Sequence, residues 1–391
     1  MREFWDIFLV FLRLGLTSFG GPVAHLGYFH AELVQRRGWL SEERYAELLA
    51  LCHFLPGPAS SQLGYSIGLQ RGGALGGLAA WLGFTLPSAV LMTLGAVWWR
   101  MGIGAEIPGF WAGLKAAAVA VVAHALWQMS ARLCRQRWQW PLIVASAVLL
   151  WIVPAAVTQM VVLVLCTWIG WVQRRPDTGS MPRLSSQGKT GLISGILLVL
   201  MLIGLPAWAQ WSGRLELQTA ADFFRAGTLV FGGGHVVLPW LEQSVLASER
   251  VTPEAFMAGY GMAQALPGPL FTFASYLGAL LAPEGTWTVL FWSFGALVMI
   301  FLPGFLWLHL ALPHWDRIRS FQGADQAMAG AHAAVAGLLL AALIDPVAKV
   351  GITGWVTAGV AAGSWILLSR SRVPVWAIVM LAGLSGWWLM P

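Results

Sequence analysis

The sequence predicts an all-α integral membrane protein made of two homologous halves in inverted topology. Hydrophobic residues make up 58% of the 391 positions and charged residues only 10%, whereas a soluble domain carries about a quarter charged residues. Apolar runs such as 74–98 and 190–210 approach or exceed the roughly 20 residues needed to cross a bilayer. An internal repeat then divides the chain, because the pattern of 11–25 recurs at 223–237.

The repeat is carried by glycine and proline motifs. "FLRLGLTSFGGPVAH" (11–25) is echoed by "FFRAGTLVFGGGHVV" (223–237), and the "LPGP" of 55–58 returns at 266–269. These matches predict four parts along the chain: a first repeat (1–172), a polar cytoplasmic linker (173–189), a connecting transmembrane helix (190–210) and a second repeat (211–391).

Apolar runs and their Pro and Gly punctuation predict the helices in order. In the first half we expect a hairpin over 4–36 broken at Gly20-Gly21-Pro22, a shorter hairpin over 43–70 broken at Pro56-Gly57-Pro58, full spans over 74–98 and 107–131, and short spans over 139–153 and 156–172. The span 190–210 follows. The second half repeats the scheme over 216–247, 254–281, 286–311, 321–344 and a final pair ending at 390.

Loop charges indicate how the halves are oriented. If each hairpin enters and leaves by one side, the span 190–210 carries the chain across and inverts the second half. Lys and Arg then gather in the loops assigned to the cytoplasm, as the positive-inside rule requires. Among the Lys and Arg residues in loops, those on the opposite side are Arg100, Arg214, Arg250 and Lys349. The net charge of +6 is therefore an orientation signal, and no nucleic-acid partner is expected.

The broken hairpins predict an anion site near the midplane. Unpaired backbone groups are tolerated at membrane depth only where they are buried in protein or line a wet cavity. Proline ends the incoming helix, and the outgoing helix begins with free N–H groups that carry partial positive charge. An arm of 12 residues rises about 18 Å, so the turns of both halves can meet. Matching interruptions in inverted repeats are typical of transporter binding sites.

The candidate residues lie at and beside these breaks. The predicted anion-binding residues are Gly20, Gly21, Pro22, Pro56, Gly57, Pro58, Ser60, Ser61, Gly232, Gly233, Gly234, Pro267, Gly268, Pro269 and Thr272. Ionisable side chains within membrane segments are functional candidates by default. Those considered for charge or proton transfer are Arg13, Arg225, Lys115, His25, His53 and His235. A purely structural hairpin would use the same glycines and prolines, and a packing role also fits any one of the histidines.

Other function classes lack their motifs. "RLSSQGKT" (183–190) has Arg183 where a phosphate-binding loop has glycine, and no HExxH or GxSxG motif occurs. Cys52, Cys134 and Cys166 are scattered through apolar surroundings, which argues against a disulfide framework or a zinc site. The first residues lack the pattern of a removable signal peptide. We therefore expect a protein that is no enzyme and needs no cofactor or metal.

Six short motifs resemble one known family, the chromate ion transporter superfamily. They are "FGGPVAH" (19–25), "LPGP" (55–58) followed by "GYSIG" (64–68), "FTLP" (84–87), "FGGGH" (231–235) and "LPGP" (266–269). The match covers nearly the whole chain and is similar to the long, bidomain members. It implies a multi-pass protein of the bacterial inner membrane that exports chromate and confers resistance to it. The second half departs from the first at Gly234 and at Phe271-Thr272-Phe273, so the halves need not hold the ligand equally.

The sequence thus favours a secondary oxyanion exporter driven by the membrane potential or by ion exchange. A dianion leaving an interior-negative cell at about 150 mV gains roughly 7 kcal/mol. Sulfate has the shape and charge of chromate, so a transporter or exchanger of sulfate or another oxyanion stays open. An anion channel stays open as well. The expected partners are chromate, with sulfate as the alternative, and the lipid bilayer. A homodimer stays open as the oligomeric state.

Overall fold

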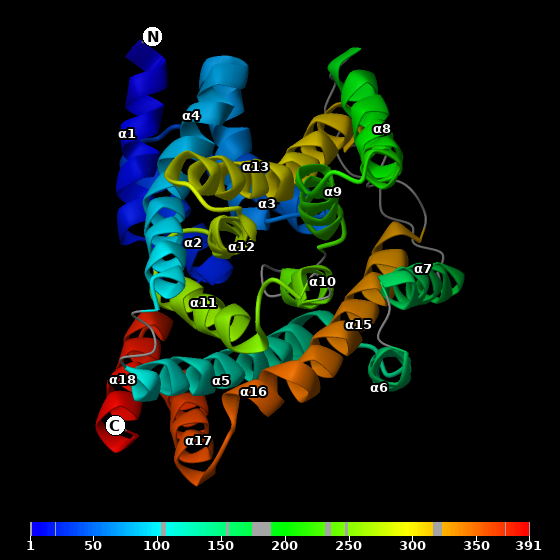
Figure 1. Ribbon diagram of the computed structural model, residues 1–391. Coiled ribbons are helices and arrows are strands. Elements are labelled where there is room, and N and C mark those ends of the chain that lie inside the picture. The colour runs from blue at the N-terminus through cyan, green and yellow to red at the C-terminus, as the bar shows by residue number, and fades with distance from the viewer. Residues whose placement is uncertain are drawn as a thin grey trace.

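Helices, several of them interrupted, form most of the described chain (Figure 1). The computed structural model describes residues 2–19, 21–102, 107–153, 156–173, 189–230, 236–246, 249–315, 323–371 and 373–390. No strand occurs in these ranges, so the predicted all-α class is confirmed. The first-half elements are α1 (Arg2–Thr17), α2 (Gly21–Phe29), η1 (His30–Arg36), α3 (Glu42–Phe54), α4 (Ala59–Arg100), α5 (Pro108–Leu133), α6 (Gln139–Ile152) and α7 (Ala156–Val172).

The connecting helix and the second half follow the same plan. Their elements are α8 (Lys189–Ser212), α9 (Leu215–Thr228), α10 (Val237–Leu246), α11 (Pro253–Ala265), η4 (Leu270–Thr272), α12 (Phe273–Leu281), α13 (Thr286–Ala311), η5 (Leu312–His314), α15 (Ala324–Ala342), η6 (Leu343–Ala348), α16 (Lys349–Gly351), α17 (Trp355–Arg370) and α18 (Val375–Leu389). Helices end before both "LPGP" motifs and restart after them, as the sequence predicts.

Within the described ranges, five helical segments are long and apolar enough to cross a membrane. They are Ala59–Arg100, Pro108–Ala131, Gly191–Ser212, Thr286–His314 and Asp325–Gly351. Gly191–Ser212 differs from the others because only 11% of its apolar window is buried, against 56–61% in the other four. α8 therefore lies at the periphery, where it packs on α9 and α13. The length and apolar character of these segments indicate a multi-pass membrane protein.

Two of the long helices contain internal breaks. α4 is assigned to 59–100, but Gly72 and Gly73 have non-helical backbone, with φ +62° at Gly73, so two helices meet there and the predicted break between 43–70 and 74–98 is confirmed. The predicted span 321–344 is followed by the π-helical segment η6, which the sequence does not predict and in which Asp345 has φ −140° and ψ 118°. Asp345 precedes Pro346, and the proline ring disfavours helical backbone at the preceding residue. The irregularity in η6 therefore has a local cause.

The halves exchange their last two helices. α6 and α7 of the first half pack on α15 of the second, while α17 and α18 of the second half pack on α5 of the first. Glycines make both contacts close: Gly113 of α5 lies against the carbonyl of Ala382, and Gly330 of α15 lies against that of Cys166. Figure 1 shows α5 beside α17 and α18, and α15 beside α6 and α7. Each half thus completes the packing of the other.

Candidate functional site

The helix breaks of the two halves are joined by backbone hydrogen bonds. Gly57 N–H donates to the carbonyl of Val230 at 2.7 Å, and Gly268 N–H donates to the carbonyl of Ser18 at 3.0 Å. Ser18 and Val230 hold equivalent places, each directly before a Phe-Gly-Gly motif. The "LPGP" turn of each half is therefore in contact with the first helix break of the other half.

Both turns depend on glycine. Gly57 has φ +124° and Gly268 has φ +97°, a region that residues with a Cβ rarely adopt. A Cβ at Gly57 would also lie 2.8 Å from Gln62 Nε2 and 3.0 Å from the Cα of Gly304. One at Gly268 would lie 2.9 Å from Ser88 Oγ. Each turn thus packs on the long helix of the other half, next to the proline inside that helix.

Gln62 fixes the first of these contacts. Its Nε2 donates to the carbonyls of Pro56 and Gly304, both at 2.9 Å. The side chain is fully buried, so these bonds tie the "LPGP" turn of the first half to α13 of the second. Since both amide hydrogens are used, Gln62 acts as a positioning residue and is not free to donate to a ligand.

A buried polar cluster surrounds the break of the first half. We define it by five residues, of which none is more than 3% exposed. They are Ser18, His25, Ser60, Ser61 and Thr85. His25 Nδ1 lies 3.4 Å from Ser60 Oγ, the backbone of Ser18 is within hydrogen-bonding reach of His25, and the imidazole packs edge-on against Phe84. Ser61 and Thr85 are included because they directly follow Ser60 and Phe84 in the sequence.

Several polar atoms of this cluster have no hydrogen-bond partner among the described residues. They are Ser18 Oγ, His25 Nε2, Ser61 Oγ and Thr85 Oγ1. A buried polar group without a partner costs about 1–3 kcal/mol. The N-terminus of α4 adds free backbone N–H groups beside Ser60 and Ser61. The cluster can therefore donate several hydrogen bonds to an anion.

The second half carries apolar residues at the equivalent positions. Val230 stands for Ser18, Val237 for His25 and Phe271 for Ser60, and all three are buried. Thr272 stands for Ser61, and its hydroxyl donates to the carbonyl of Pro269 at 2.8 Å. The donors are therefore concentrated at one of the two breaks.

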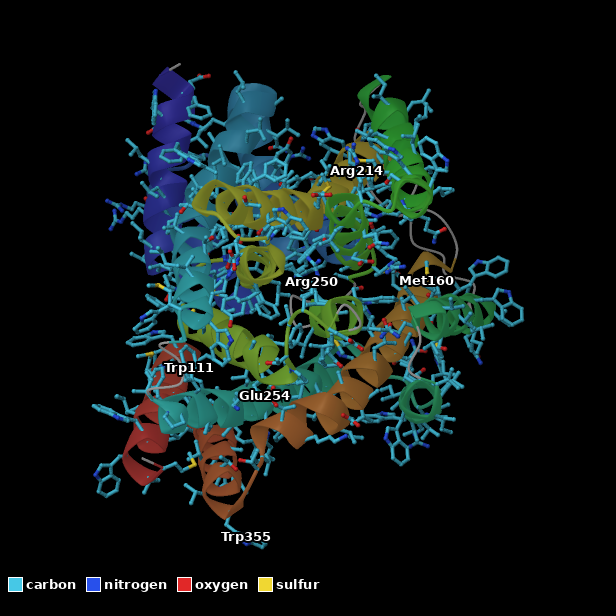
Figure 2. The ribbon with its side chains drawn as sticks, viewed as in Figure 1. Trp111, Met160, Arg214, Arg250, Glu254 and Trp355 are labelled. Carbon is cyan, nitrogen blue, oxygen red and sulfur yellow. The ribbon has the colours of Figure 1, made fainter. Side chains whose placement is uncertain are left out.

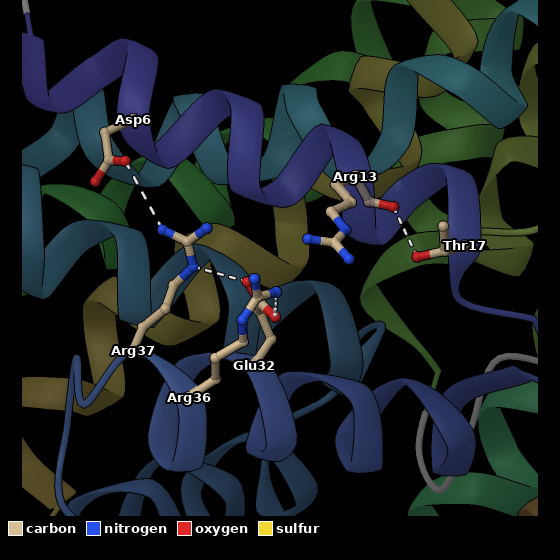
Figure 3. Close-up of polar contacts among 6 residues, drawn as sticks. All are labelled: Asp6, Arg13, Thr17, Glu32, Arg36 and Arg37. Carbon is tan, nitrogen blue, oxygen red and sulfur yellow. Dashed lines mark hydrogen bonds and ion pairs between the residues drawn. The ribbon is translucent and has the colours of Figure 1, made fainter.

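The two intramembrane arginines are in different surroundings. Arg225 on α9 forms an ion pair with Asp222 at 2.7 Å. Arg13 on α1 is exposed, and no acidic side chain of the described chain lies within ion-pair distance of it. Figure 3 shows its guanidinium directed from α1 toward the helix that carries Glu32. Of these two arginines, Arg13 is therefore the one that is available to bind an anion.

The other ionisable candidates lie outside the polar cluster. Lys115 on α5 is within electrostatic range of Glu254 at the start of α11, which Figure 2 places beside α5. His53, in the last turn of α3, is exposed and acts electrostatically on His332 of α15. Neither observation links these two side chains to the "LPGP" turns.

Some predicted residues fall outside the described chain. They are Gly20, Gly232, Gly233, Gly234 and His235. Gly21 and Pro22 begin α2, and only their backbone is described. At the second turn, Pro267, Gly268 and Pro269 lie between α11 and η4, as predicted.

Sequence reasoning missed several polar residues that the fold brings to the breaks. Ser18 directly precedes Phe-Gly-Gly, while Thr85 and Ser88 flank Leu86-Pro87 inside α4. A hydroxyl residue beside a proline or glycine break is a detectable signal, because it can satisfy the backbone groups that the break frees. Ser275 of α12, which the sequence does offer as a hydroxyl donor after the second turn, is buried, and its hydroxyl has no partner in the described part of the chain.

Comparison with known proteins gives consistent results along the chain. The chain is 26% identical to the chromate transport protein of Pseudomonas aeruginosa, over 99% of this chain and 92% of that one. It is 26% identical to the chromate transport protein of Cupriavidus metallidurans, over 87% and 81%. It is 27% identical to a probable chromate transport protein of Synechococcus elongatus, over 96% and 93%. No solved structure matches the chain significantly.

The family model described as "Chromate transporter" matches the chain twice, at residues 5–171 and at residues 217–387. These two segments contain both "LPGP" turns, the polar cluster and the pair of exchanged helices from each half. The chain belongs to the chromate transporter family.

Proposed function

We propose that this protein exports chromate across the bacterial inner membrane and binds the anion at the polar cluster of its first half. The observation that carries the proposal is the set of buried hydroxyls at one helix break that have no partner among the described residues: Ser18 Oγ, Ser61 Oγ and Thr85 Oγ1. The names of the relatives support chromate as the substrate.

The chemistry of the cluster suits a tetrahedral oxyanion. Chromate offers only oxygen acceptors, and the hydroxyls of Ser18, Ser61 and Thr85 can each donate to one. A hydrogen bond to a charged partner contributes about 1.5–3 kcal/mol. The N-terminus of α4 adds partial positive charge. The cluster therefore offers hydrogen bonds at several points around a dianion.

Export follows from the sign of the charge. In an interior-negative cell, a dianion that leaves at about 150 mV gains roughly 7 kcal/mol, so export needs no ATP. We also propose that the two repeats are inverted, as the loop charges favour. Ion exchange or proton coupling can add to this driving force.

The helix exchange suggests which parts move. Since α6–α7 and α17–α18 each pack on the other half, the halves do not part as independent lobes. We propose instead that access alternates through shifts at the "LPGP" turns and at the prolines inside α4 and α13, namely Pro87 and Pro303. Helices bend most readily at proline, where the hydrogen-bond ladder is already broken.

Uptake by everted vesicles tests the proposal. With an imposed potential, positive inside the vesicle, they should accumulate radiolabelled chromate, and Ser61→Ala should raise KM about tenfold because one donor to the charged ligand is lost. Ser364→Ala, which changes a buried serine of α17, is the matched control and should behave as wild type. Equal KM values for the two variants would remove the polar cluster from the proposal.

The same vesicles separate the alternatives. Competition by unlabelled sulfate at concentrations similar to chromate would assign a general oxyanion transporter. Flux that does not saturate, together with single-channel currents in planar bilayers, would assign an anion channel. Saturable chromate uptake without such currents is the result we expect.

A further inference from the structure

α1 presents a polar stripe between its buried face and its lipid-facing side. Asp6, Arg13 and Thr17 are spaced by seven and four residues, which at about 100° per residue places them within roughly 40° of one another. The side chains on the buried face are Ile7, Val10, Phe11, Leu14 and Ser18. The exposed apolar side chains are Trp5, Leu9 and Leu16. The stripe is therefore a separate polar face of a largely apolar helix.

The stripe faces η1 and the turn that follows it. Asp6 Oδ1 lies 3.9 Å from Arg37 Nη1, and Arg37 Nε donates to Glu32 at 2.7 Å. Arg36 also donates to Glu32, at 2.9 Å. Figure 3 shows these contacts bridging the space between α1 and η1. We call this space, bordered by the α1 stripe and by Glu32, Arg36 and Arg37, the α1–η1 seam.

Further contacts close the outer end of the seam. Arg71 Nη2 of α4 lies 3.6 Å from Asp6 Oδ2. The ring of Trp39 lies 4.4 Å from the guanidinium of Arg71 and 5.6 Å from that of Arg37. These ion pairs are partly exposed, and such pairs are weak. The closure can therefore open without disturbing the buried core.

Positive charge is in excess along the seam. Glu32 is already bonded to two arginines and Asp6 contacts two, whereas Arg13 has no acidic side chain of the described residues within ion-pair distance. The equivalent Arg225 pairs with Asp222, at a position where α1 carries Val10. The two halves thus differ in whether this arginine is neutralised.

The inner end of the seam adjoins the polar cluster along the chain. Thr17 is exposed, its hydroxyl donates to the carbonyl of Arg13 at 2.8 Å, and the next residue is Ser18. From Asp6 to Ser18 the helix rises about 18 Å. Asp6, Arg13 and Thr17 therefore mark a polar line, with the buried Val10 beside it, that runs from the ion pairs of Asp6 toward the helix break.

We propose that the α1–η1 seam is the route by which an oxyanion reaches the polar cluster, with Arg13 as the cationic side chain that it passes. This inference rests on the proposed function only for the identity of the anion. An excess of positive charge along a passage raises the local concentration of anions and their rate of entry, by about 10- to 1000-fold where a single sign of charge lines it.

Thiol labelling tests the route without measuring transport. In a protein whose three cysteines are replaced, Thr17→Cys should react with a membrane-impermeant, anionic methanethiosulfonate. Leu16→Cys, one residue away on the lipid-facing side, should not. The anionic reagent should react at least about tenfold faster with Thr17→Cys than a cationic reagent of similar size. Chromate should slow the reaction.

Charge variants on the Thr17→Cys background complete the test. Arg13→Gln should abolish the preference for the anionic reagent, Arg13→Lys should keep it, and Arg214→Gln should leave it unchanged. Arg214 is an exposed arginine at the start of α9, on a different part of the molecule (Figure 2). The route would be overturned if Thr17→Cys were as unreactive as Leu16→Cys. It would also be overturned if the anionic and cationic reagents labelled Thr17→Cys at equal rates. Vesicle uptake is measured separately. If the vesicles transport chromate but Thr17→Cys is not labelled, the proposed route is wrong and the proposed function still stands.

Discussion

At the scale of single residues, the site depends on side chains whose roles differ between equivalent positions. Gln62 ties a turn to the other half, while its counterpart in the repeat is Phe273. The sequence predicts Ser60 and Ser61 as donors because they follow a proline break. It does not predict Ser18 or Thr85, because their neighbours come from distant parts of the chain. Burial of an isolated hydroxyl residue is decided by tertiary packing.

Gln62→Leu should destabilise the protein strongly. The change leaves two buried carbonyls, of Pro56 and Gly304, without this donor, and each unsatisfied group costs about 1–3 kcal/mol. We expect a lower melting temperature in detergent and reduced chromate uptake. Gln218→Leu, at an exposed position of α9, should melt like wild type. Equal melting temperatures for the two variants would contradict a role for the Gln62 bridge.

Gly57→Ala should impair folding more than an ordinary glycine substitution. The left-handed backbone and the close approach of Gln62 Nε2 both oppose a Cβ, and backbone strain of this kind costs about 1–3 kcal/mol. Gly295→Ala, in α13 with no atom within 4 Å of the added Cβ, is the matched control. The measurement is the yield of monodisperse protein on size exclusion. A full yield of Gly57→Ala would show that the turn tolerates a side chain.

At the scale of helices, apolar runs and proline breaks predict most boundaries. The predicted span 286–311 coincides with α13, and α5 begins one residue after its predicted start. The break predicted between 70 and 74 falls at Gly72 and Gly73, whose backbone is not helical. The π-helical segment η6 escapes the pattern, although Asp345 within it has the extended backbone that Pro346 favours.

Gly330→Ala should weaken the contact between α15 and α7. The added methyl would overlap the carbonyl of Cys166, and overpacking of this kind costs about 1–3 kcal/mol. Gly359→Ala in α17, where nothing lies within 4 Å of the added Cβ, serves as the control. Thermal unfolding in detergent should show a lower melting temperature for the first variant alone. An unchanged value would mean that the helices can shift apart at little cost.

At the scale of the whole molecule, the repeat reveals two related halves but not how they combine. Similarity between Gly113 and Gly330 shows that α5 and α15 are equivalent, and it does not tell which helices each of them contacts. The exchange of α6–α7 with α17–α18 depends on side-chain fit between segments far apart in sequence. Only the folded structure supplies that information.

Cutting the chain in the polar linker tests this exchange. Fragments 1–188 and 189–391 should co-purify when expressed together, because each supplies two helices that the other needs. Expressed alone, each fragment should be degraded or aggregate, since the flank of α5 or α15 would lose its glycine-lined contacts. A monodisperse single fragment would contradict the mutual dependence of the halves. Size exclusion and protease resistance provide the measurements.

The helix exchange also bears on how the duplicated gene could diverge. A polypeptide with only one repeat would need the last two helices of a second copy to cover α5 or its equivalent. Every mutation would then be present in both subunits of that homodimer. Covalent fusion ends this symmetry. One copy can then keep hydroxyls and an arginine without an acidic partner, while the other carries valine and phenylalanine at the corresponding positions.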